Sequence, residues 1–222
     1  MEYFFGTKIL IPAAGYGRRL GSPAAKELLS LSGSGKTLIE EALDLVASFG
    51  FSTVVITRKD KVEVIAYFKN KKQEERWGAR LELLGIDFSS EWPDTLLKSQ
   101  HLWGPRNLVL LPDTVFRPQN ILAQMDEQLK VVDAVFATHV VDDGKNWVVI
   151  QRRGEDFWLC EKPQGIASAQ AWGLFVFQKH AGQILLQNML ESTFDHQWRK
   201  LPSKVQFLEL EGFRDLARGE AR

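Results

Sequence analysis

The sequence predicts an α/β protein whose fold is a three-layer, Rossmann-like mixed sheet, built as a single domain over residues 1–222. Two observations support this prediction. Short apolar, β-branched runs alternate with segments of helical periodicity in the first part of the chain, and from Ala134 onward strands follow one another with little helix between them. Alternation is typical of βαβ units and a parallel sheet, so the later strands are expected to add mixed or antiparallel pairs.

The expected strands are apolar runs bounded by turn residues. They cover residues 8–12, 53–57, 81–84, 108–111, 134–140, 147–151, 157–160, 171–177 and 205–210. An apolar stripe at helical spacing from Leu38 to Val46 predicts a helix, and Thr37 with Glu40 three residues later forms a capping-box pattern at its start. Further helices are predicted over residues 62–69, 95–102, 121–129 and 181–190.

Composition narrows the classes of partner and site. Lys plus Arg and Asp plus Glu number 28 each, so no global field draws the chain to nucleic acid or to an anionic membrane. Any phosphate ligand must therefore be held locally. The single cysteine, Cys160, excludes an internal disulfide and a multi-cysteine metal site. Its position directly after Phe157-Trp158-Leu159 favours a buried structural thiol over a nucleophile.

Neither end nor middle of the chain resembles a targeting or membrane segment. The start lacks a basic stretch followed by a long apolar one, and no run approaches the roughly 18 apolar residues of a membrane span. We therefore expect a cytoplasmic protein, and the sequence leaves open whether it forms a homo-oligomer.

A loop of small residues follows the first expected strand. Lys8–Pro12 runs directly into Ala13-Ala14-Gly15-Tyr16-Gly17-Arg18-Arg19-Leu20. Small residues let backbone N–H groups approach a polyphosphate closely, and an arginine beside them can form forked bonds to phosphate oxygens. The loop therefore predicts a triphosphate site.

The glycine-rich segments allow other interpretations. Gly15-x-Gly17 opens a dinucleotide-binding fingerprint, but Arg18-Arg19-Leu20 stand where a third small residue is needed, and Gly21-Ser22-Pro23 interrupts the helix. The interpretation of this loop as a structural turn without a ligand also remains open. The second segment, Ser32–Thr37, resembles a Walker loop but has Ser30 where that motif needs glycine, which favours a turn leading into the Thr37 helix cap.

Read together, several segments resemble the sugar-phosphate nucleotidyltransferases, represented by glucose-1-phosphate thymidylyl- and uridylyltransferases. The loop is followed by Lys26-Glu27-Leu28-Leu29 and Gly35–Glu40, as in the opening of that family. Later landmarks keep the family's order along nearly the whole chain: Leu108–Asp113, Glu161-Lys162-Pro163, Ala171–Phe177 and Thr193-Phe194-Asp195. Glu-Lys-Pro is the most discriminating of these, and their order gives the resemblance its weight.

The resemblance implies a nucleotide-diphospho-sugar transferase fold, with a nucleotide-binding half at residues 1–132 and a sugar-phosphate-binding half at residues 133–222. It implies magnesium-dependent transfer of a nucleoside monophosphate from a nucleoside triphosphate to a sugar-1-phosphate, with release of pyrophosphate. The catalytic residues that it implies are Arg19, Lys26, Asp113 and Lys162. The nucleotide would be bound by Ala13, Ala14, Gly15, Gly17, Arg19, Lys26 and Thr95, the sugar phosphate by Glu161, Lys162 and Gly173, and Mg²⁺ by Asp113 and Asp195.

These residue types suit the chemistry. An anionic acceptor phosphate needs no general base to attack the α-phosphorus in line, so catalysis reduces to alignment and charge neutralisation. Mg²⁺ usually takes one or two carboxylates beside substrate phosphates, so a pair of aspartates suffices. Asp94 is interpreted as a helix-cap residue rather than a base contact.

Two alternatives remain. Pro12–Gly15, Arg18–Gly21 and Asp113–Pro118 resemble the cytidylyltransferase that acts on methylerythritol phosphate, a non-sugar phosphorylated alcohol. The other alternative is a catalytically silent nucleotide-sugar-binding or regulatory protein. It is motivated by departures from the family pattern, which are Ala14 for the usual glycine, Ala25 for the usual proline, and Pro112 and Thr114 beside Asp113.

Overall fold

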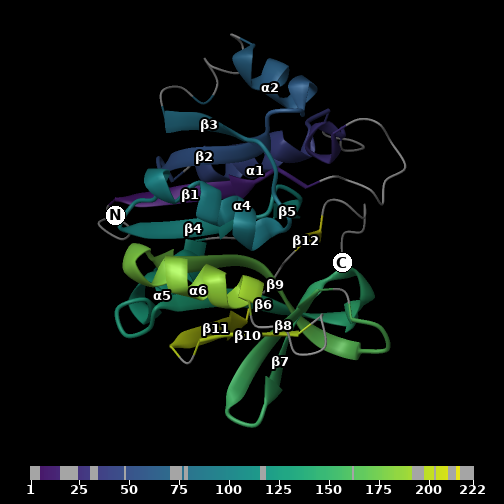
Figure 1. Cartoon of the computed structure of the whole chain (residues 1–222), viewed down its shortest axis with the longest axis vertical. Helices are drawn as coiled ribbons and strands as arrows, with labels where there is room; N and C mark the ends of the chain where they lie inside the picture. Colours follow the sequence, from purple (N-terminus) through teal and green to yellow (C-terminus); the bar gives the residue numbers. More distant parts are fainter. Residues whose placement is uncertain are drawn as a thin grey trace. The chain divides into compact units, whose positions relative to one another are not determined.

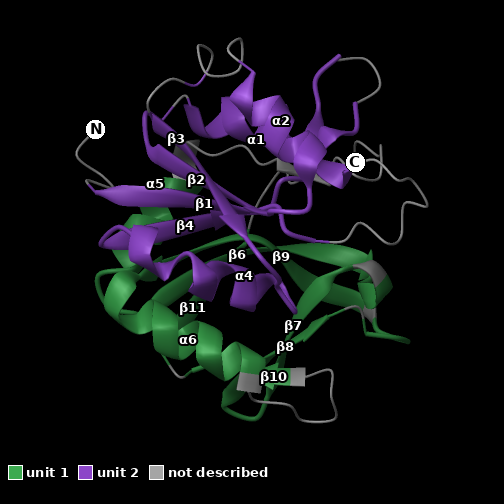
Figure 2. Cartoon of the chain, turned by 45° about the horizontal axis from the view of Figure 1, so that its top comes forward, with its two compact units in different colours: residues 1–5, 116–213 green, residues 6–115, 214–222 purple. Residues whose placement is uncertain are grey.

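A computed structural model gives the structure of the chain. It describes residues 6–15, 25–30, 35–47, 49–70, 77, 80–115, 119–161, 163–191, 198–202, 204–209 and 214–215. The chain forms two compact units, shown in different colours in Figure 2. Unit 2 comprises residues 6–115 and 214–222, and unit 1 comprises residues 1–5 and 116–213.

Unit 2 is built on a parallel sheet. Its strands are β1 (Thr7–Pro12), β2 (Ser52–Arg58), β3 (Leu81–Ile86) and β4 (Arg106–Leu110), in the order β4-β1-β2-β3. All neighbouring pairs are parallel. The middle of β1 is fully buried, as expected for a strand covered on both faces. Parallel strands end at one edge, so the segments that follow β1, β2 and β4 leave the sheet together (Figure 1).

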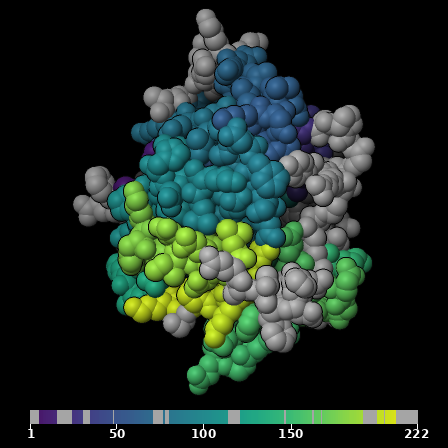
Figure 3. Space-filling view, viewed as in Figure 1, coloured from purple at the N-terminus to yellow at the C-terminus, as the bar shows by residue number. Residues whose placement is uncertain are grey.

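The helices of unit 2 connect these strands. They are α1 (Leu38–Ala47), α2 (Val62–Lys69) and α4 (Trp92–Lys98), with the short 3₁₀ turns η2 (Lys26–Leu28) and η4 (Gln100–Leu102). The predicted capping box of α1 is confirmed: the Thr37 N–H donates to Glu40 Oε2 over 2.8 Å, and the Glu40 N–H donates to Thr37 Oγ1 over 3.3 Å. Helix α4 packs against β1, and Figure 3 shows it at the surface of the face turned to the viewer.

Unit 1 contains a mixed sheet. Its strands are β6 (Ala134–Asp143), β7 (Val148–Arg153), β8 (Asp156–Glu161), β9 (Ala167–Gln178), β10 (Trp198–Lys200) and β11 (Val205–Glu209). The order is β10-β8-β7-β9-β6-β11, and only the β6–β11 pair is parallel among the pairs of these described strands. The helices are α5 (Gln119–Gln128), α6 (Lys179–Glu191) and the 3₁₀ turn η5 (Gly144–Asn146).

Aromatic side chains form the centre of unit 1. Phe136 of β6 stacks on Phe175 of β9 with ring centroids 4.8 Å apart, and Trp172 meets both rings edge-on. All three side chains are at most 2% exposed. Large aromatic residues contribute much of the buried apolar area of such a core, which explains why the mixed sheet is rich in Phe and Trp.

The predicted strands and helices all appear; α2 has the predicted ends, and most of the other elements begin or end at a shifted residue. One correction concerns α4, which was predicted to start at residue 95 and to reach 102. It begins at Trp92, since Pro93 suits the first helical turn, and ends at Lys98 before η4. Three short strands were missed: β10, and the pair β5 (Thr114–Val115) and β12 (Arg214–Asp215). Among the helices in the described ranges, none is long and apolar enough to cross a membrane.

Candidate nucleotide site

Two predicted site segments leave the same edge of the unit 2 sheet. Ala13, Ala14 and Gly15 follow β1, and Asp113 comes three residues after the end of β4. Strands β1 and β4 are adjacent and parallel, with Leu10 opposite Val109. The carboxyl ends of the strands in an open α/β sheet are where ligands bind, so the sheet places both segments where a nucleotide would be bound.

Lys26 and Asp113 form an ion pair at this edge. Lys26 Nζ donates to Asp113 Oδ2, although the two residues are 87 positions apart in the sequence. Both side chains are partly buried, with 29% of the lysine and 19% of the aspartate exposed. The structure therefore brings together two residues that were predicted separately, one as a triphosphate contact and one as a magnesium ligand.

The backbone at Gly15 is open. Among the described residues, no heavy atom lies within 4 Å of the position that a Cβ would occupy there. Gly15 is also exposed, whereas Ala13 and Ala14 before it are 1% and 3% exposed. The start of the loop is therefore packed into the unit, while Gly15 is accessible to a ligand.

A buried charge cluster lies against the start of the loop, and sequence reasoning missed it. Lys61 Nζ donates to both carboxylate oxygens of Glu27 and to the carbonyl oxygen of Ala13, each over 2.9 Å. The side chains of Lys61 and Glu27 are only 8% and 5% exposed. Lys61 follows β2 at the same sheet edge, and a lysine in that position was the sequence signal that could have indicated it.

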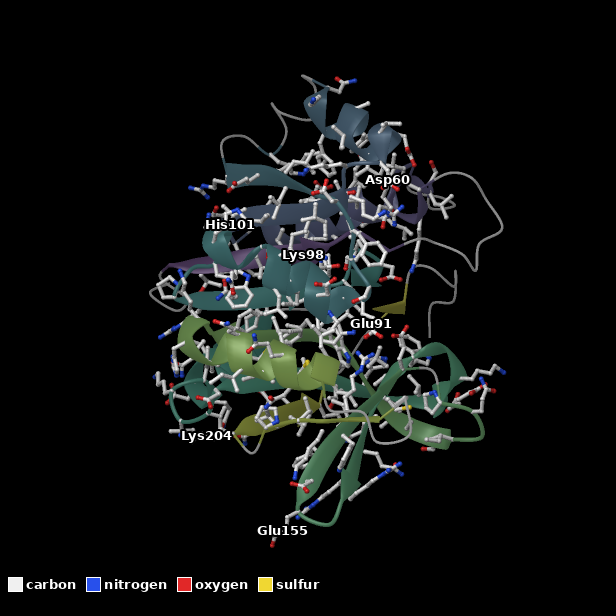
Figure 4. The ribbon with its side chains drawn as sticks, in the orientation of Figure 1. Asp60, Glu91, Lys98, His101, Glu155 and Lys204 are labelled. Carbon is white, nitrogen blue, oxygen red and sulfur yellow. The ribbon has the colours of Figure 1, made fainter. Side chains whose placement is uncertain are left out.

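Arg58, the last residue of β2, makes a second link to the loop. Its Nη1 donates to the Ala14 carbonyl oxygen over 2.8 Å, and its Nε donates to Asp60 Oδ1 over 2.8 Å. The hydrogen bond from Arg58 holds the pKa of Asp60 below its usual value, which keeps the carboxylate charged. Figure 4 labels Asp60 in the segment that follows β2.

Lys36 is engaged on helix α1. Its Nζ lies 3.0 Å from Asp44 Oδ2 and 3.8 Å from Glu41 Oε1. With the confirmed Thr37–Glu40 capping box, these contacts agree with a turn that leads into a helix cap and not with a phosphate-binding lysine. Ser32, Gly33 and Ser34 of the same motif lie outside the described residues.

The side chains of Thr95 and Asp94 in helix α4 form hydrogen bonds to the segment just before the helix. The Thr95 side chain is 3% exposed; its Oγ1 lies 2.5 Å from Ser89 Oγ and donates to the Glu91 carbonyl over 3.2 Å. A contact from Thr95 to a nucleobase stays a prediction. The prediction of Asp94 as the N-cap residue is wrong: the helix begins at Trp92, its N-cap is Glu91, and Asp94 lies in the first turn, where it accepts the N–H of Ser90 over 2.9 Å. Burial alone would raise the pKa of Asp94, but hydrogen bonds from Lys98 and Ser90 outweigh burial and lower it. Figure 4 labels Glu91 and Lys98, near the two ends of the helix.

Two predicted acceptor residues lie in unit 1. Glu161 is the exposed last residue of β8. Gly173 is buried in β9 at an irregularity in the pairing with β6, where Ala137 faces Leu174 but Thr138 faces Trp172. Gly173 is therefore the extra residue of a β-bulge, a position that glycine often occupies within a strand.

Four predicted residues, Gly17, Arg19, Lys162 and Asp195, lie outside the described part of the chain. In the described part, no three His, Cys, Asp or Glu side chains are grouped to hold a metal ion. Asp113 still fits Mg²⁺, because this ion takes hard oxygen ligands and often uses one or two carboxylates beside substrate phosphates. The residues present are thus compatible with a metal held largely by the triphosphate.

The sequence profile of the MobA-like NTP transferase domain matches residues 9–155, more than half of the chain. The chain belongs to this family, and it is therefore a member of a nucleotidyltransferase family. No curated protein matches the chain by sequence.

Solved structures identify the fold. A structure described as a glucose-1-phosphate thymidylyltransferase from Bacillus anthracis, in complex with sucrose, matches with a TM-score of 0.71 and 19% identity, over 95% of this chain and 90% of that one. UDP-glucose pyrophosphorylase from Acinetobacter baumannii matches with a TM-score of 0.64 and 16% identity, over 96% and 89% of the two chains. A UTP-bound UGPase from the same organism matches with a TM-score of 0.59 and 17% identity, also over 96% and 89%. The chain has the mixed α/β fold, with a parallel core, of the sugar nucleotidyltransferases, as the sequence predicted.

Proposed function

We propose that this protein transfers a nucleoside monophosphate from a nucleoside triphosphate to a sugar-1-phosphate, releases pyrophosphate and uses Mg²⁺. The main supporting observation is the ion pair of Lys26 with Asp113 at the strand edge where Ala13–Gly15 leave β1. In a member of an NTP transferase family, this arrangement matches the two needs of nucleotidyl transfer, a cation for the phosphates and a carboxylate for the metal.

The ion pair leaves both groups able to bind substrate. A lysine ammonium has three donors and a carboxylate has about four acceptor positions, so one shared hydrogen bond uses only part of each. In the proposed complex, Lys26 keeps contact with Asp113 while it donates to an α-phosphate oxygen. Asp113 would hold Mg²⁺, which supplies charge neutralisation on the triphosphate when bound. Arg19 would bind the β- and γ-phosphates.

The transfer itself needs little acid–base chemistry from the chain. An oxygen of the acceptor phosphate forms a bond to the α-phosphorus in line with the bond that breaks, and pyrophosphate leaves with the electron pair. Since the attacking oxygen is already anionic, no general base is needed. Lys26 and Lys162 are proposed to neutralise the charges of the two phosphates so that they can approach each other.

The proposal of a sugar-1-phosphate as the acceptor is based on motifs in the second half of the chain. The Glu161-Lys162-Pro163 motif is followed by a strand that carries Gly173, as in the sugar branch of the resemblance. Three structures of the same fold are named for glucose-1-phosphate or UDP-glucose chemistry, which favours a sugar-1-phosphate over a non-sugar alcohol phosphate as the acceptor.

The test is a pyrophosphate-release assay with Mg²⁺, the common nucleoside triphosphates and a panel of sugar-1-phosphates and methylerythritol phosphate. We expect turnover with at least one sugar-1-phosphate. Asp113→Ala should lower kcat by about 100-fold or more, as expected when an electrostatic contact at the reacting phosphates is lost. Asp87→Asn is the control, because Asp87 is 84% exposed and pairs with the exposed Lys59.

Other outcomes separate the alternatives. Turnover with methylerythritol phosphate alone would overturn the sugar acceptor and support the cytidylyltransferase alternative. Triphosphate binding without turnover on any acceptor would support the silent nucleotide-sugar-binding alternative. Full activity of Asp113→Ala would contradict the proposed metal role.

A further inference from the structure

The loop that starts at Ala13 is tied to η2 through one buried side chain. The ammonium of Lys61 makes three hydrogen bonds of 2.9 Å, two to the carboxylate of Glu27 and one to the carbonyl of Ala13. An ammonium has three donors, so these acceptors use all of them. Ala13 lies where the loop leaves β1, and Glu27 lies in the turn that follows the loop. Lys61 thus joins the start of the loop to the turn η2.

Glu27 is also the direct neighbour of Lys26. The turn η2 comprises only Lys26, Glu27 and Leu28, and Glu27 is its buried residue. Because Lys61 holds the Glu27 side chain, it also restrains the backbone of the turn. The Lys26 side chain extends from this turn to Asp113. A movement of the Glu27–Lys61 pair would therefore displace Lys26 from the strand edge.

Arg58 fixes the next peptide of the loop. It donates to the Ala14 carbonyl, while Lys61 donates to the Ala13 carbonyl, so two successive carbonyl oxygens are bound by cations from the end of β2 and from the segment that follows it. A free carbonyl oxygen carries partial negative charge and would repel a phosphate. Holding both oxygens on these cations reduces that repulsion where the loop begins.

A contribution to folding stability is a weak explanation for the buried Glu27–Lys61 pair. Replacing a buried ion pair by well-packed apolar residues is often neutral or stabilising, because the pair must be desolvated. A buried pair does fix one geometry. The pair contacts the start of the loop through Lys61 and shares a turn with Lys26 through Glu27, so the geometry that it fixes would control substrate binding.

From these contacts we infer that Lys61, paired with Glu27 and assisted by Arg58, is a positioning residue that fixes the start of the triphosphate loop at Ala13 and Ala14 and the direction of Lys26. It acts through Ala13, Glu27 and Lys26 and does not touch the substrate. This inference rests on the proposed function, since it assumes that the loop and Lys26 bind a triphosphate.

The test compares triphosphate binding among folded variants by calorimetric titration, with Mg²⁺ and each of ATP, GTP, CTP, UTP and dTTP. Lys61→Met alone leaves Glu27 buried and unpaired, which is strongly destabilising. The main variant is therefore the double substitution Lys61→Met with Glu27→Leu, which removes both charges at similar volume. We expect it to unfold at a temperature close to that of wild type but to bind the preferred triphosphate about tenfold more weakly or worse, since small misplacements at such sites are costly.

Controls distinguish positioning from a general loss of structure. Lys59→Met removes a lysine that is 61% exposed in the same segment, and it should bind like wild type. In turnover assays, the double variant should raise KM for the triphosphate and leave KM for the acceptor unchanged. If the double variant does not fold, Arg58→Gln is used in its place: it removes the hydrogen bond to the Ala14 carbonyl together with the bonds to the exposed Asp60, and it is expected to weaken binding in the same direction.

The outcomes are separable from those of the proposed function. If wild type binds none of the five triphosphates, the proposed function fails. If wild type binds one of them and the folded double variant, or Arg58→Gln in its place, binds it equally well, the positioning role of this cluster is overturned and the proposed function stands.

Discussion

The burial of Cys160 could be predicted from its neighbours in the sequence. The prediction that Cys160 is a buried structural thiol is confirmed: the side chain is fully buried, and burial raises its pKa to about 11. A thiol with such a pKa stays protonated at neutral pH and is a poor nucleophile. The apolar residues before Cys160 indicated this outcome, because a short apolar run in a strand is usually covered by its neighbours.

Contacts between distant residues were harder to predict. The sequence predicted that Lys26 and Asp113 lie near each other. Lys26 comes after the loop that follows β1, Asp113 follows β4, and parallel strands end at one edge of a sheet. For the Glu27–Lys61 pair, the sequence indicates a lysine after β2 at the sheet edge, but no pattern shared by the two segments pairs that lysine with Glu27. Only the packing of η2 against the segment after β2 creates that pair.

His139 gives a prediction at this scale. It lies in β6, is 7% exposed, and meets the Trp147 ring edge-on with centroids 5.0 Å apart. Burial lowers its pKa from 6.5 to about 4. The folded protein therefore keeps His139 neutral over a pH range where the unfolded chain already binds a proton, so protonation favours the unfolded state as the pH falls from 6.5 to 4.

We expect the free energy of unfolding to fall by up to about 3 kcal/mol over this range because of His139. Urea unfolding at pH 7, 5.5 and 4 measures the change. His139→Phe should lose most of the dependence between pH 6.5 and 4, whereas His101→Asn, which changes an exposed histidine, should retain it. An unchanged dependence in His139→Phe would contradict the assignment.

Elements with their own sequence pattern were predictable. The main strands and helices were found from apolar runs and helical periodicity. The missed strands β5, β10 and β12 are two or three residues long and include charged residues such as Arg199 and Lys200. Such strands depend on a partner strand for their hydrogen bonds and carry too few residues for a period to show.

Helix α1 allows a test of local sequence control. Thr37→Ala removes the hydroxyl that accepts the Glu40 N–H, and loss of an N-terminal cap typically costs about 1 kcal/mol. We expect urea denaturation to show a decrease of that size in the free energy of unfolding. Thr37→Ser keeps the hydroxyl and should lie within a few tenths of wild type. Equal stability of Thr37→Ala and wild type would show that the capping box contributes nothing.

At the scale of the whole molecule, the order of elements defines the fold, and the site defines the activity. A fold alone does not fix a function, because one architecture can hold many sites. Here the family match, the strand-edge loop and the Lys26–Asp113 pair all indicate nucleotidyl transfer. The proposed acceptor site uses the Glu161-Lys162-Pro163 segment, where Lys162 lies outside the described residues, so sequence and fold predict the nucleotide half in more detail than the acceptor half.

The most direct test of nucleotidyl transfer is ³¹P NMR of the reaction with Mg²⁺, the preferred triphosphate and a sugar-1-phosphate. Attack on the α-phosphorus predicts equal amounts of free pyrophosphate and of a new pyrophosphate diester, which joins the nucleoside to the sugar. Lys26→Met should slow both signals together, because Lys26 is proposed to act at the α-phosphate. Release of inorganic phosphate with a nucleoside diphosphate, and no new diester, would contradict the proposed transfer.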